Sequence, residues 1–337
     1  DPVTPTSPVR QVRPEAAGYA ANLQAANTLF ALSLHDRVGE TAYRDALTGE
    51  VRTTSLWVRN EGGRTTTSMV DGQNRNHTNR YVLQLGGDVL KRSTDRYGDF
   101  SLGVMGGYAS AKGQTYNALK GYGARNTVSG YGTGLYGTWR QNGEAKGGLY
   151  ADGWLQYNWF SNSVKGQDLA VERYDSRGLT ASLETGYDWQ AAAWDTASGL
   201  RNTLWLRPHA QVAWMGVRAD DHVEQNGTRV QGTGNDNVQT TLGVRAYLNG
   251  KSALDRDTGR EFQPYVEANW VHNAGQYGVR MNEVGDSMKG TRNAGELKAG
   301  VEAKVSSRLS VWGGVSGLMG DAGYSDVGAS LGGRYSF

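Results

Sequence analysis

The feature that most constrains this chain is an alternation of apolar with polar, small or charged residues, repeated in about twelve segments from Ser55 onward. A period of two is that of a β-strand whose two faces meet different surroundings. The segments are about ten residues long or longer, whereas strands of soluble proteins cluster at five or six residues. Such long strands are typical of proteins that cross a membrane as a β-barrel. The segments centre near Val58, Leu85, Val104, Leu135, Leu155, Leu183, Ala210, Val244, Val266, Val301, Val315 and Leu331.

Tyrosine and tryptophan lie near the ends of the apolar faces, as in the aromatic girdles of membrane barrels. The connections also alternate in length, with long polar ones predicted on the outer rim. An even strand number places the first strand beside the last, so the sheet closes without a free edge. The sequence therefore predicts an all-β fold, a transmembrane antiparallel up-and-down β-barrel. The aromatic positions are Tyr108, Trp139, Trp159, Trp189, Trp214 and Trp270, and the long connections are Asp71–Asn79, Lys112–Arg125, Val164–Arg173, Arg218–Asn235 and Gln276–Asn293.

One stretch has a different period, because Pro14 to Gly39 is predicted to form a single α-helix. Pro14 suits the first helical position, and Gly39 can supply a left-handed stop. Such a helix is roughly 36 Å long, which matches the thickness of a membrane. Its polar residues exclude a lipid-facing helix, so we expect this N-terminal helix inside the lumen of the barrel. The residues expected to carry its lumenal contacts are Tyr19, Asn22, Gln24, Asn27, His35 and Arg37.

The predicted size of the barrel suits an enclosed helix. Eight strands leave an interior filled by side chains and sixteen leave an open channel, so about twelve leave a bore close to the width of one helix. Many predicted inward positions are glycine, which gives a helix room to approach. Because both signs of charge are interspersed, pairing is favoured over an ion-selective pore. These glycines are Gly103, Gly107, Gly130, Gly132 and Gly134, and the predicted lumen-lining charges are Arg59, Glu61, Asp152, Glu184, Arg207, Arg245, Glu267, Glu296, Lys298 and Glu302.

The composition excludes some classes of function and suggests the domain limits. With 35 Lys and Arg against 33 Asp and Glu, the net charge of +2 gives no electrostatic case for nucleic acid as a partner. The absence of cysteine excludes disulfides and cysteine-ligated metal sites. Residues 1–13 are rich in proline and are expected to be a linker from an absent N-terminal passenger. Residues 14–53 are expected to form the lumenal helix and its connector, and residues 54–337 the barrel.

Two local motifs resemble parts of enzymes. Gly132–Gly137 matches the dinucleotide fingerprint GxGxxG, but it lies inside a predicted strand rather than before a helix, so no cofactor is predicted. Asp220, Asp221 and His222 are the most enzyme-like cluster, yet adjacent residues diverge, whereas a catalytic constellation converges from several elements. A solvated acidic loop is therefore favoured over catalysis. No metal-ligand spacing accompanies the other histidines, and the chain is predicted not to be an enzyme.

The final eight residues are the most specific signal in the chain. They form an amphipathic strand that ends on an aromatic residue, which suits the membrane interface and closure against the first strand. Ser330, Gly332, Tyr335 and the terminal Phe337 also resemble the terminal signal read by the barrel-assembly machinery of the outer membrane.

With these segments, the chain is similar to the translocator domain of classical, type Va autotransporters, in the AIDA-type and pertactin-like group. The similarity rests on the linker, the run NLQAANTLFALSLHDRVGE, the strand WVRNEGGR from Trp57 to Arg64, and the terminal aromatic. It implies a monomeric barrel of the Gram-negative outer membrane with a helix threaded through it. It also implies that an N-terminal passenger is carried to the surface and anchored, which is type V secretion. The implied partners are outer-membrane lipids, the passenger, the barrel-assembly machinery and periplasmic chaperones.

Alternatives to this interpretation remain open at the level of sequence. One branch of the family cleaves an Asn-Asn junction inside the helix, but Asn22 and Asn27 are isolated here, so autoproteolysis within this chain is not predicted. The runner-up is an outer-membrane pore or barrel enzyme with an N-terminal plug helix, which a convergent carboxylate–histidine site in the loops would favour. A soluble all-β binding protein is the third class.

Overall fold

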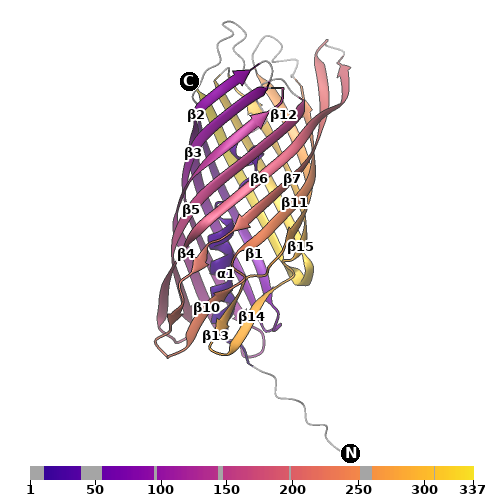
Figure 1. Cartoon of the computed structure of the whole chain (residues 1–337). Coiled ribbons are helices and arrows are strands. Elements are labelled where there is room, and N and C mark those ends of the chain that lie inside the picture. Colours follow the sequence, from indigo (N-terminus) through magenta and orange to yellow (C-terminus); the bar gives the residue numbers. More distant parts are fainter. Residues whose placement is uncertain are drawn as a thin grey trace, which may run out of the picture.

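The structure is a computed structural model that describes residues 11–38, 55–94, 97–142, 147–196, 199–250, 260–306 and 308–337. Twelve long strands form one closed antiparallel barrel around an N-terminal helix (Figure 1). Each of the twelve predicted segment centres lies in one of these strands, so the predicted fold class is confirmed. The long strands are β1 (Ser55–Met69), β2 (Asn74–Thr94), β3 (Gly98–Asn117), β4 (Gly123–Arg140), β5 (Gly148–Gly166), β6 (Val171–Asp195), β7 (Arg201–Met215), β11 (Asn237–Asn249), β12 (Glu261–Asn273), β15 (Asn293–Lys304), β16 (Leu309–Gly320) and β17 (Ser325–Ser336).

The barrel closes because its first strand pairs with its last. The β1–β17 register runs from Ser55 opposite Ser336 to Thr66 opposite Ser325. β1 therefore begins at the rim where β17 ends, which we call the C-terminal rim. The opposite rim, where β10, β13 and β14 lie in Figure 1, is called the hairpin rim.

The connections at the hairpin rim differ from the prediction. Long loops are predicted at Asp71–Asn79, Lys112–Arg125 and Val164–Arg173, but residues of strands β2, β3, β4, β5 and β6 occupy much of these ranges. Their polar side chains belong to strand ends; the buried Asn76 donates to Asn126 at 2.8 Å, for example. Residues 218–235 and 276–293 do connect long strands, but they contain short strands of their own. These are β8 (Arg218–Ala219), β9 (His222–Val223), β10 (Arg229–Thr233), β13 (Gly278–Met281) and β14 (Val284–Lys289), and a 3₁₀ turn, η2 (Asp321–Gly323), joins β16 to β17.

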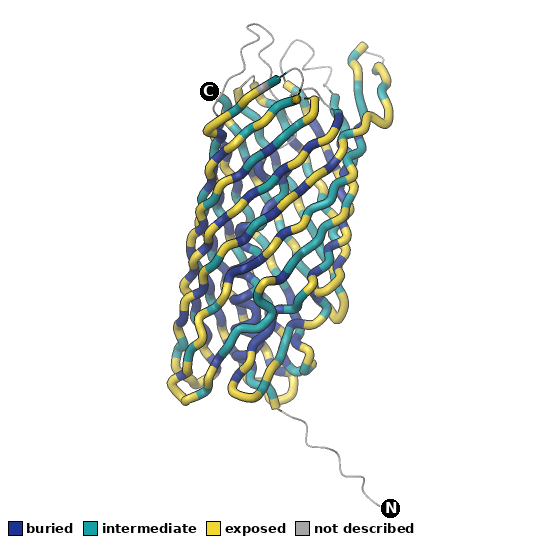
Figure 2. The backbone as a smooth tube through the Cα atoms, viewed as in Figure 1, coloured by how far each residue is buried: buried dark blue, intermediate teal, exposed yellow. Residues whose placement is uncertain are grey.

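The two faces of the barrel wall differ as the alternation predicts. Buried and exposed residues alternate along the strands in Figure 2, and neighbouring positions differ sharply: Leu183 is 74% exposed and Glu184 is 7% exposed. The outward face is apolar and carries an aromatic row, in which Tyr108, Tyr131 and Trp159 meet across three strands at ring-centroid distances of 5.3 and 6.2 Å. The wall is thus apolar outside and polar inside, as a lipid-embedded barrel requires.

A charge on the outward face is expected to destabilise the barrel. On β6, Leu183 lies midway between the outward Trp189 and Arg177, which pairs with Trp159. Leu183→Arg should lower the free energy of unfolding by about 2–4 kcal/mol, because it places a charge near the midplane of the bilayer. Urea unfolding in lipid vesicles measures this change. Leu183→Ala is the control, and an equal loss in both variants would contradict a lipid-facing position.

The prediction of a single helix from Pro14 to Gly39 is wrong, because the structure divides this segment into two helices. Helix α1 runs Glu15–Thr28 and a short α2 runs Leu34–Val38, with a non-helical link at residues 29–33. Gly39 and the predicted connector lie outside the described residues. The break is set by a reciprocal cap, in which Asp36 Oδ2 accepts from the backbone N–H of Ser33 at 2.9 Å and Ser33 Oγ accepts from the N–H of Asp36 at 3.3 Å. In the described part of the chain, no helix is both long and apolar enough to cross a membrane.

Candidate functional site

The lumen of the barrel is the candidate site, and α1 occupies it near the hairpin rim (Figure 1). The helix is buried on nearly every side. Alanines and one glycine make this fit possible: a Cβ on Gly18 would lie 3.3 Å from Asn126 Cβ and 3.4 Å from Val164 Cγ1. The short hairpins also cover the helix, since Val230, Val279 and Met281 pack in one cluster with Ala16 and Tyr19.

Polar side chains of α1 bind the wall at the positions singled out from the sequence. Asn22 donates to Tyr174 Oη at 3.1 Å and accepts from Asn126 Nδ2 at 2.9 Å. Asn27 donates to the carbonyl of Val217 at 3.0 Å and accepts from its N–H at 2.9 Å. The hydroxyl of Tyr19 donates to Glu224 at 2.9 Å, and Gln24 donates to Tyr324 Oη at 3.3 Å. Each of these predicted helix residues therefore contacts the wall or a rim hairpin.

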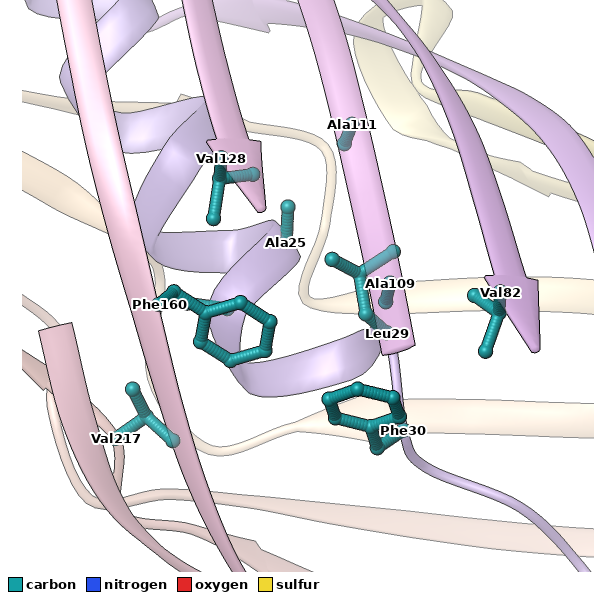
Figure 3. Packing of buried hydrophobic residues seen from close by; sticks show 10 residues of the cluster. Ala25, Leu29, Phe30, Val82, Ala109, Ala111, Val128, Phe160 and Val217 are labelled. Atoms are coloured by element: carbon teal, nitrogen blue, oxygen red, sulfur yellow. The ribbon is translucent and has the colours of Figure 1, made fainter. Parts of the chain in front are cut away.

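The end of α1 is held by an aromatic anchor, Phe30. Its ring stacks on Phe160 with a centroid distance of 5.6 Å, among small and branched residues from several strands (Figure 3). Glycines make room for the ring, because a Cβ on either Gly107 or Gly132 would lie 2.9 Å from a Phe30 ring atom. Two of the predicted inward glycines thus border the anchor, while Gly103 and Gly134 border the wall side chains Tyr136 and Gln156.

Filling the glycine space should displace Phe30. Gly132→Leu is expected to cost about 1–3 kcal/mol of folding free energy, since the added side chain overlaps the ring. Urea unfolding measures the loss, and Phe30→Ala in the Gly132→Leu background should recover part of it. Thr133→Leu, an outward substitution on the same strand, is the matched control. Equal effects at the two positions would show that the anchor space is unimportant.

The link after Phe30 is held through its main chain. The carbonyl of Phe30 accepts from Gln84 Nε2 at 3.2 Å and from Gln156 Nε2 at 3.0 Å. The carbonyl of Leu32 accepts from Trp154 Nε1 and Gln211 Nε2, both at 3.0 Å. The N–H of Leu34 donates to Glu184 Oε2 at 2.8 Å. The wall thus satisfies backbone groups that a continuous helix would have satisfied internally.

Helix α2 is fixed by a buried ion pair. Arg37 pairs with Asp152, donates to Thr138 Oγ1 at 2.9 Å, and lies 3.9 Å over the ring centroid of Tyr136. Both charged side chains are almost completely buried. His35 packs edge-on against Tyr265 with a centroid distance of 4.8 Å. All six predicted helix residues therefore face the wall or the hairpins, but through two helices rather than one.

The predicted lumen-lining charges lie inside the barrel and several of them pair. Arg245 pairs with Glu267 on the neighbouring strand, and Glu267 Oε1 lies 3.5 Å from His209 Nε2. Lys298 Nζ lies 3.7 Å from Glu296 Oε2. Among the described residues, ion pairs of predicted lumen residues include Arg37–Asp152, Arg59–Glu61, Arg80–Glu61, Arg207–Asp188, His209–Glu267, Arg245–Glu267 and Lys298–Glu296. Glu184 accepts from Tyr150, and Glu302 is fully buried.

Sequence reasoning missed several inward charges that complete these networks. Arg80 bridges Glu61 and Asp326, with distances of 3.0 and 2.6 Å. Arg334 pairs with Asp88 at 2.9 Å, beside the closing seam. Strand parity could have found them, because Arg80 and Asp88 are each four residues from the inward Gln84. The missed residues are Arg80, Asp88, Asp188, Asp326 and Arg334.

In the enzyme-like cluster of Asp220, Asp221 and His222, each side chain contacts a different partner. His222 stacks on Tyr174 at a centroid distance of 4.8 Å, Asp221 accepts from Gln231 at 2.6 Å, and Asp220 lies 3.9 Å from Arg177. The run Gly132–Gly137 lies inside β4, which continues to Arg140, rather than at the start of a helix. Within the described residues, no cluster of three or more His, Asp and Glu side chains is placed to hold a metal ion.

A carboxyl pair lies at the hairpin rim, outside the membrane-spanning part of the strands. Asp286 on β14 accepts from the N–H of Asp71 at 3.4 Å. Asp71 in turn accepts from the N–H of Gln73 at 2.8 Å and from Asn74 Nδ2 at 2.9 Å. Burial, with the neighbouring Asp71 carboxylate, raises the pKa of Asp286 to about 6.

This pair should make the rim sensitive to pH. Because the pKa of Asp286 is higher in the folded rim than in the unfolded chain, its contribution to stability is complete below about pH 4 and is lost as the pH rises through about 6. Amide hydrogen exchange in β13–β14 should therefore be slower at pH 5 than at pH 7.5, after correction for intrinsic rates. Asp286→Asn should abolish the difference, and persistence of the difference in that variant would assign it to another group.

The predicted assembly-signal residues lie along β17 and at its end. Gly332 is an inward position, where a Cβ would lie 2.3 Å from the indole of Trp312. Tyr335 and Phe337 are exposed and meet edge-on at a centroid distance of 5.1 Å. Ser330 pairs with Glu61 of β1 across the seam. The exposed aromatic pair thus lies at the C-terminal rim.

Comparisons with known proteins identify close relatives. Residues 56–316 match the family model "Autotransporter beta-domain". The chain is 47% identical over 333 residues to the autotransporter adhesin AIDA-I of Escherichia coli, covering 99% of this chain and 26% of that protein. It is 46% identical over 325 residues to the uncharacterized protein YdeU of Escherichia coli K12, covering 96% of this chain and 70% of that protein. The chain therefore spans about a quarter of the length of the first relative.

Solved structures agree with these relatives. The crystal structure of the transport unit of AIDA-I from Escherichia coli superposes with a TM-score of 0.87 at 44% identity, covering 97% of this chain and all (100%) of that one. The β-domain of the Bordetella autotransporter BrkA gives a TM-score of 0.60 at 21% identity, covering 85% of this chain and 100% of that one. The second likeness concerns the fold alone.

Proposed function

The chain belongs to the autotransporter beta-domain family, and we propose that its lumen is the path by which a polypeptide joined to its N-terminus crosses the membrane. As a member of this family, it is a translocator domain of the outer membrane of Gram-negative bacteria. The family is one of translocators rather than enzymes. The alternative of a pore or barrel enzyme with a plug helix is not favoured.

One observation carries the proposal: the chain passes through its own barrel. Val12 and Arg13 contact Asn74 at the hairpin rim, α1 and the link lie in the lumen, and β1 begins at the C-terminal rim. Any residues joined ahead of this segment therefore leave through the hairpin rim. We assign that rim to the cell surface and the C-terminal rim to the periplasm.

The same proposal gives roles to the residues singled out above. The contacts of Tyr19, Asn22, Gln24, Asn27, His35 and Arg37 hold α1 and α2 as anchor and plug after passage. The paired lumen charges keep a polar, wettable path without fixing a net sign of charge. Residues 1–13 serve as linker, residues 14–53 as lumenal segment and connector, and residues 54–337 as barrel. No cofactor takes part.

Partners follow from the same assignment. The apolar outer wall binds outer-membrane lipids, and one copy of the chain is sufficient because the barrel is closed. The barrel-assembly machinery reads Ser330, Gly332, Tyr335 and Phe337 at the end of β17. Periplasmic chaperones keep the passenger extended before it enters the lumen.

Display of a reporter tests the proposed function. A cysteine-free, epitope-tagged polypeptide is fused ahead of Asp1, and protease is added to intact cells. The tag should be cleaved when the barrel is complete and protected when β17 is deleted, because the seam then cannot close. A tag that stays protected although the full barrel is assembled in the membrane would overturn the proposal.

A further inference from the structure

The wall treats α1 and its flanks differently. Hydrogen bonds from α1 to the wall use helix side chains, such as those of Asn22 and Asn27. In the non-helical stretches on both sides of α1, wall side chains bind main-chain groups, and in the first stretch the Arg13 side chain also pairs with Glu224. Contacts of the first kind require particular residues in the lumenal segment. Contacts of the second kind that use a carbonyl can form with any amino acid, and the one that uses a backbone N–H can form with any except proline.

The first set of main-chain contacts lies deep in the lumen. Gln84 and Gln156 both donate to the carbonyl of Phe30, and Gln211 donates to that of Leu32. Gln84 and Gln156 are almost completely buried, on β2 and β5. These three glutamines, which come from three strands, are called the inner amide collar.

The second set lies at the hairpin rim. Gln73 Oε1 accepts from the N–H of Val12 at 3.2 Å. Asn74 Nδ2 donates to the carbonyls of Val12 and Arg13, both at 3.3 Å, and Asn117 Nδ2 donates to the carbonyl of Val12 at 3.1 Å. Gln73, Asn74 and Asn117 are called the rim amide collar.

We propose that the two amide collars form a binding site for the extended main chain of a polypeptide in transit, whatever its sequence. This inference rests on the proposed function and names how the path holds its substrate. Side-chain amides suit the task because each offers both a donor and an acceptor and carries no charge. They therefore neither reject nor trap charged residues of the passenger. The finished lumenal segment occupies the collars last, through its non-helical flanks.

The distance between the collars fits this use. Phe30 lies eighteen positions after Val12, and most of the residues between them are in α1. This separation corresponds to roughly 27 Å at the helical rise. An extended chain covers the same distance with about eight residues. A passenger segment of that length can thus engage both collars at once, and the next segment can replace it.

The test compares passage rates of two reporters with unlike sequences. One cysteine-free passenger is rich in Gly, Ser and Thr, and the other is rich in Asp and Lys. Each is fused ahead of Asp1, and pulse-labelled cells are sampled for the time at which the tag becomes sensitive to external protease. The variant Gln84→Leu/Gln156→Leu removes both donors to Phe30 while keeping side-chain size. The matched control, Gln239→Leu/Gln263→Leu, removes two inward amides that hydrogen-bond within the wall, to Asn273 and Asn249.

The collar variant should slow exposure of both passengers by roughly fivefold or more, and by the same factor, as expected for the loss of one hydrogen bond or more. The control should match the parent barrel. An unchanged rate, a delay for one passenger only, or an equal delay in the control would overturn the inference. Barrel assembly is verified by heat-modifiable mobility, which is the difference in electrophoretic migration between heated and unheated samples. If the double variant does not assemble, Gln156→Leu alone replaces it. If the parent barrel exposes neither passenger, the proposed function itself fails.

Discussion

Deleting residues 1–39 should convert the barrel from a small or flickering conductor into a large, steady pore in planar bilayers. In the intact chain α1, the link and α2 fill the lumen, and the residual cavities beside them measure about 200 and 180 Å³. The first of these cavities is lined in part by the charged residues Arg59, Glu267 and Lys298. Removing the segment joins them into one wet passage about as wide as a helix.

A shorter deletion is the control for this prediction. Deleting residues 1–10 leaves α1 and both of its flanks in place, so conductance should stay at the level of the full chain. If the full chain and the variant without residues 1–39 conducted equally, the helix would lie outside the lumen when the barrel is inserted in a bilayer. That result would favour the pore or enzyme alternative.

Breaking the ion pair between Arg37 and Asp152 should strongly destabilise the barrel. Both side chains are almost completely buried, and Thr138 Oγ1 donates to Asp152 at 2.6 Å within the same network. Arg37→Ala leaves the Asp152 carboxylate buried without its partner, which typically costs about 3–5 kcal/mol. The expected result is a loss of that size in the free energy of unfolding, measured by urea titration in lipid vesicles. The lumenal segment should also be released more easily, seen as frequent opening events in single-channel recordings.

The double variant Arg37→Met/Asp152→Leu separates the pair from its surroundings. Replacing both partners by apolar side chains removes the unpaired charge, so much of the lost stability should return. A double variant as unstable as Arg37→Ala would assign the effect to lost packing on Tyr136 rather than to the charge.

The barrel could be predicted because its wall separates two unlike environments. Outward positions such as Leu183 and Leu297 meet lipid, and inward neighbours such as Glu184 and Lys298 do not, so each strand carries the alternation in its own sequence. That local pattern fixes strand number and parity without knowledge of the pairing. Closure then follows from the even count, as the β1–β17 seam confirms.

The lumenal segment could be predicted as helical but not as divided. Residues compatible with a helix continue through Leu29 and Phe30, so helix propensity predicts that the helix extends past them. The run from Ser33 to Asp36 has the spacing of a capping box and was the available signal. The decisive contacts come from Gln84, Gln156 and Gln211, which are at least 54 residues away in sequence. No local pattern contains that information.

The partners in the charge pairs likewise could not be predicted from local sequence. Arg245 and Glu267 were both predicted to face inward, yet their pairing depends on the register between β11 and β12. A shift of two residues would keep the parity and change every partner. The polar ends of β2 to β6 resemble loops in the sequence, because the membrane imposes its apolar signature only on the part of a strand that meets lipid.

The seam between β1 and β17 has a topological consequence. The barrel is a ring, and the segment ahead of β1 is a string that already passes through it. A closed barrel about one helix wide does not admit a folded domain. A polypeptide ahead of β1 must therefore be unfolded while it passes through, or must already lie on the far side when β1 and β17 pair. The second edge of the seam, β17, follows the other described strands of the barrel. The moment at which β1 and β17 pair, rather than the bore alone, therefore decides what this domain can export.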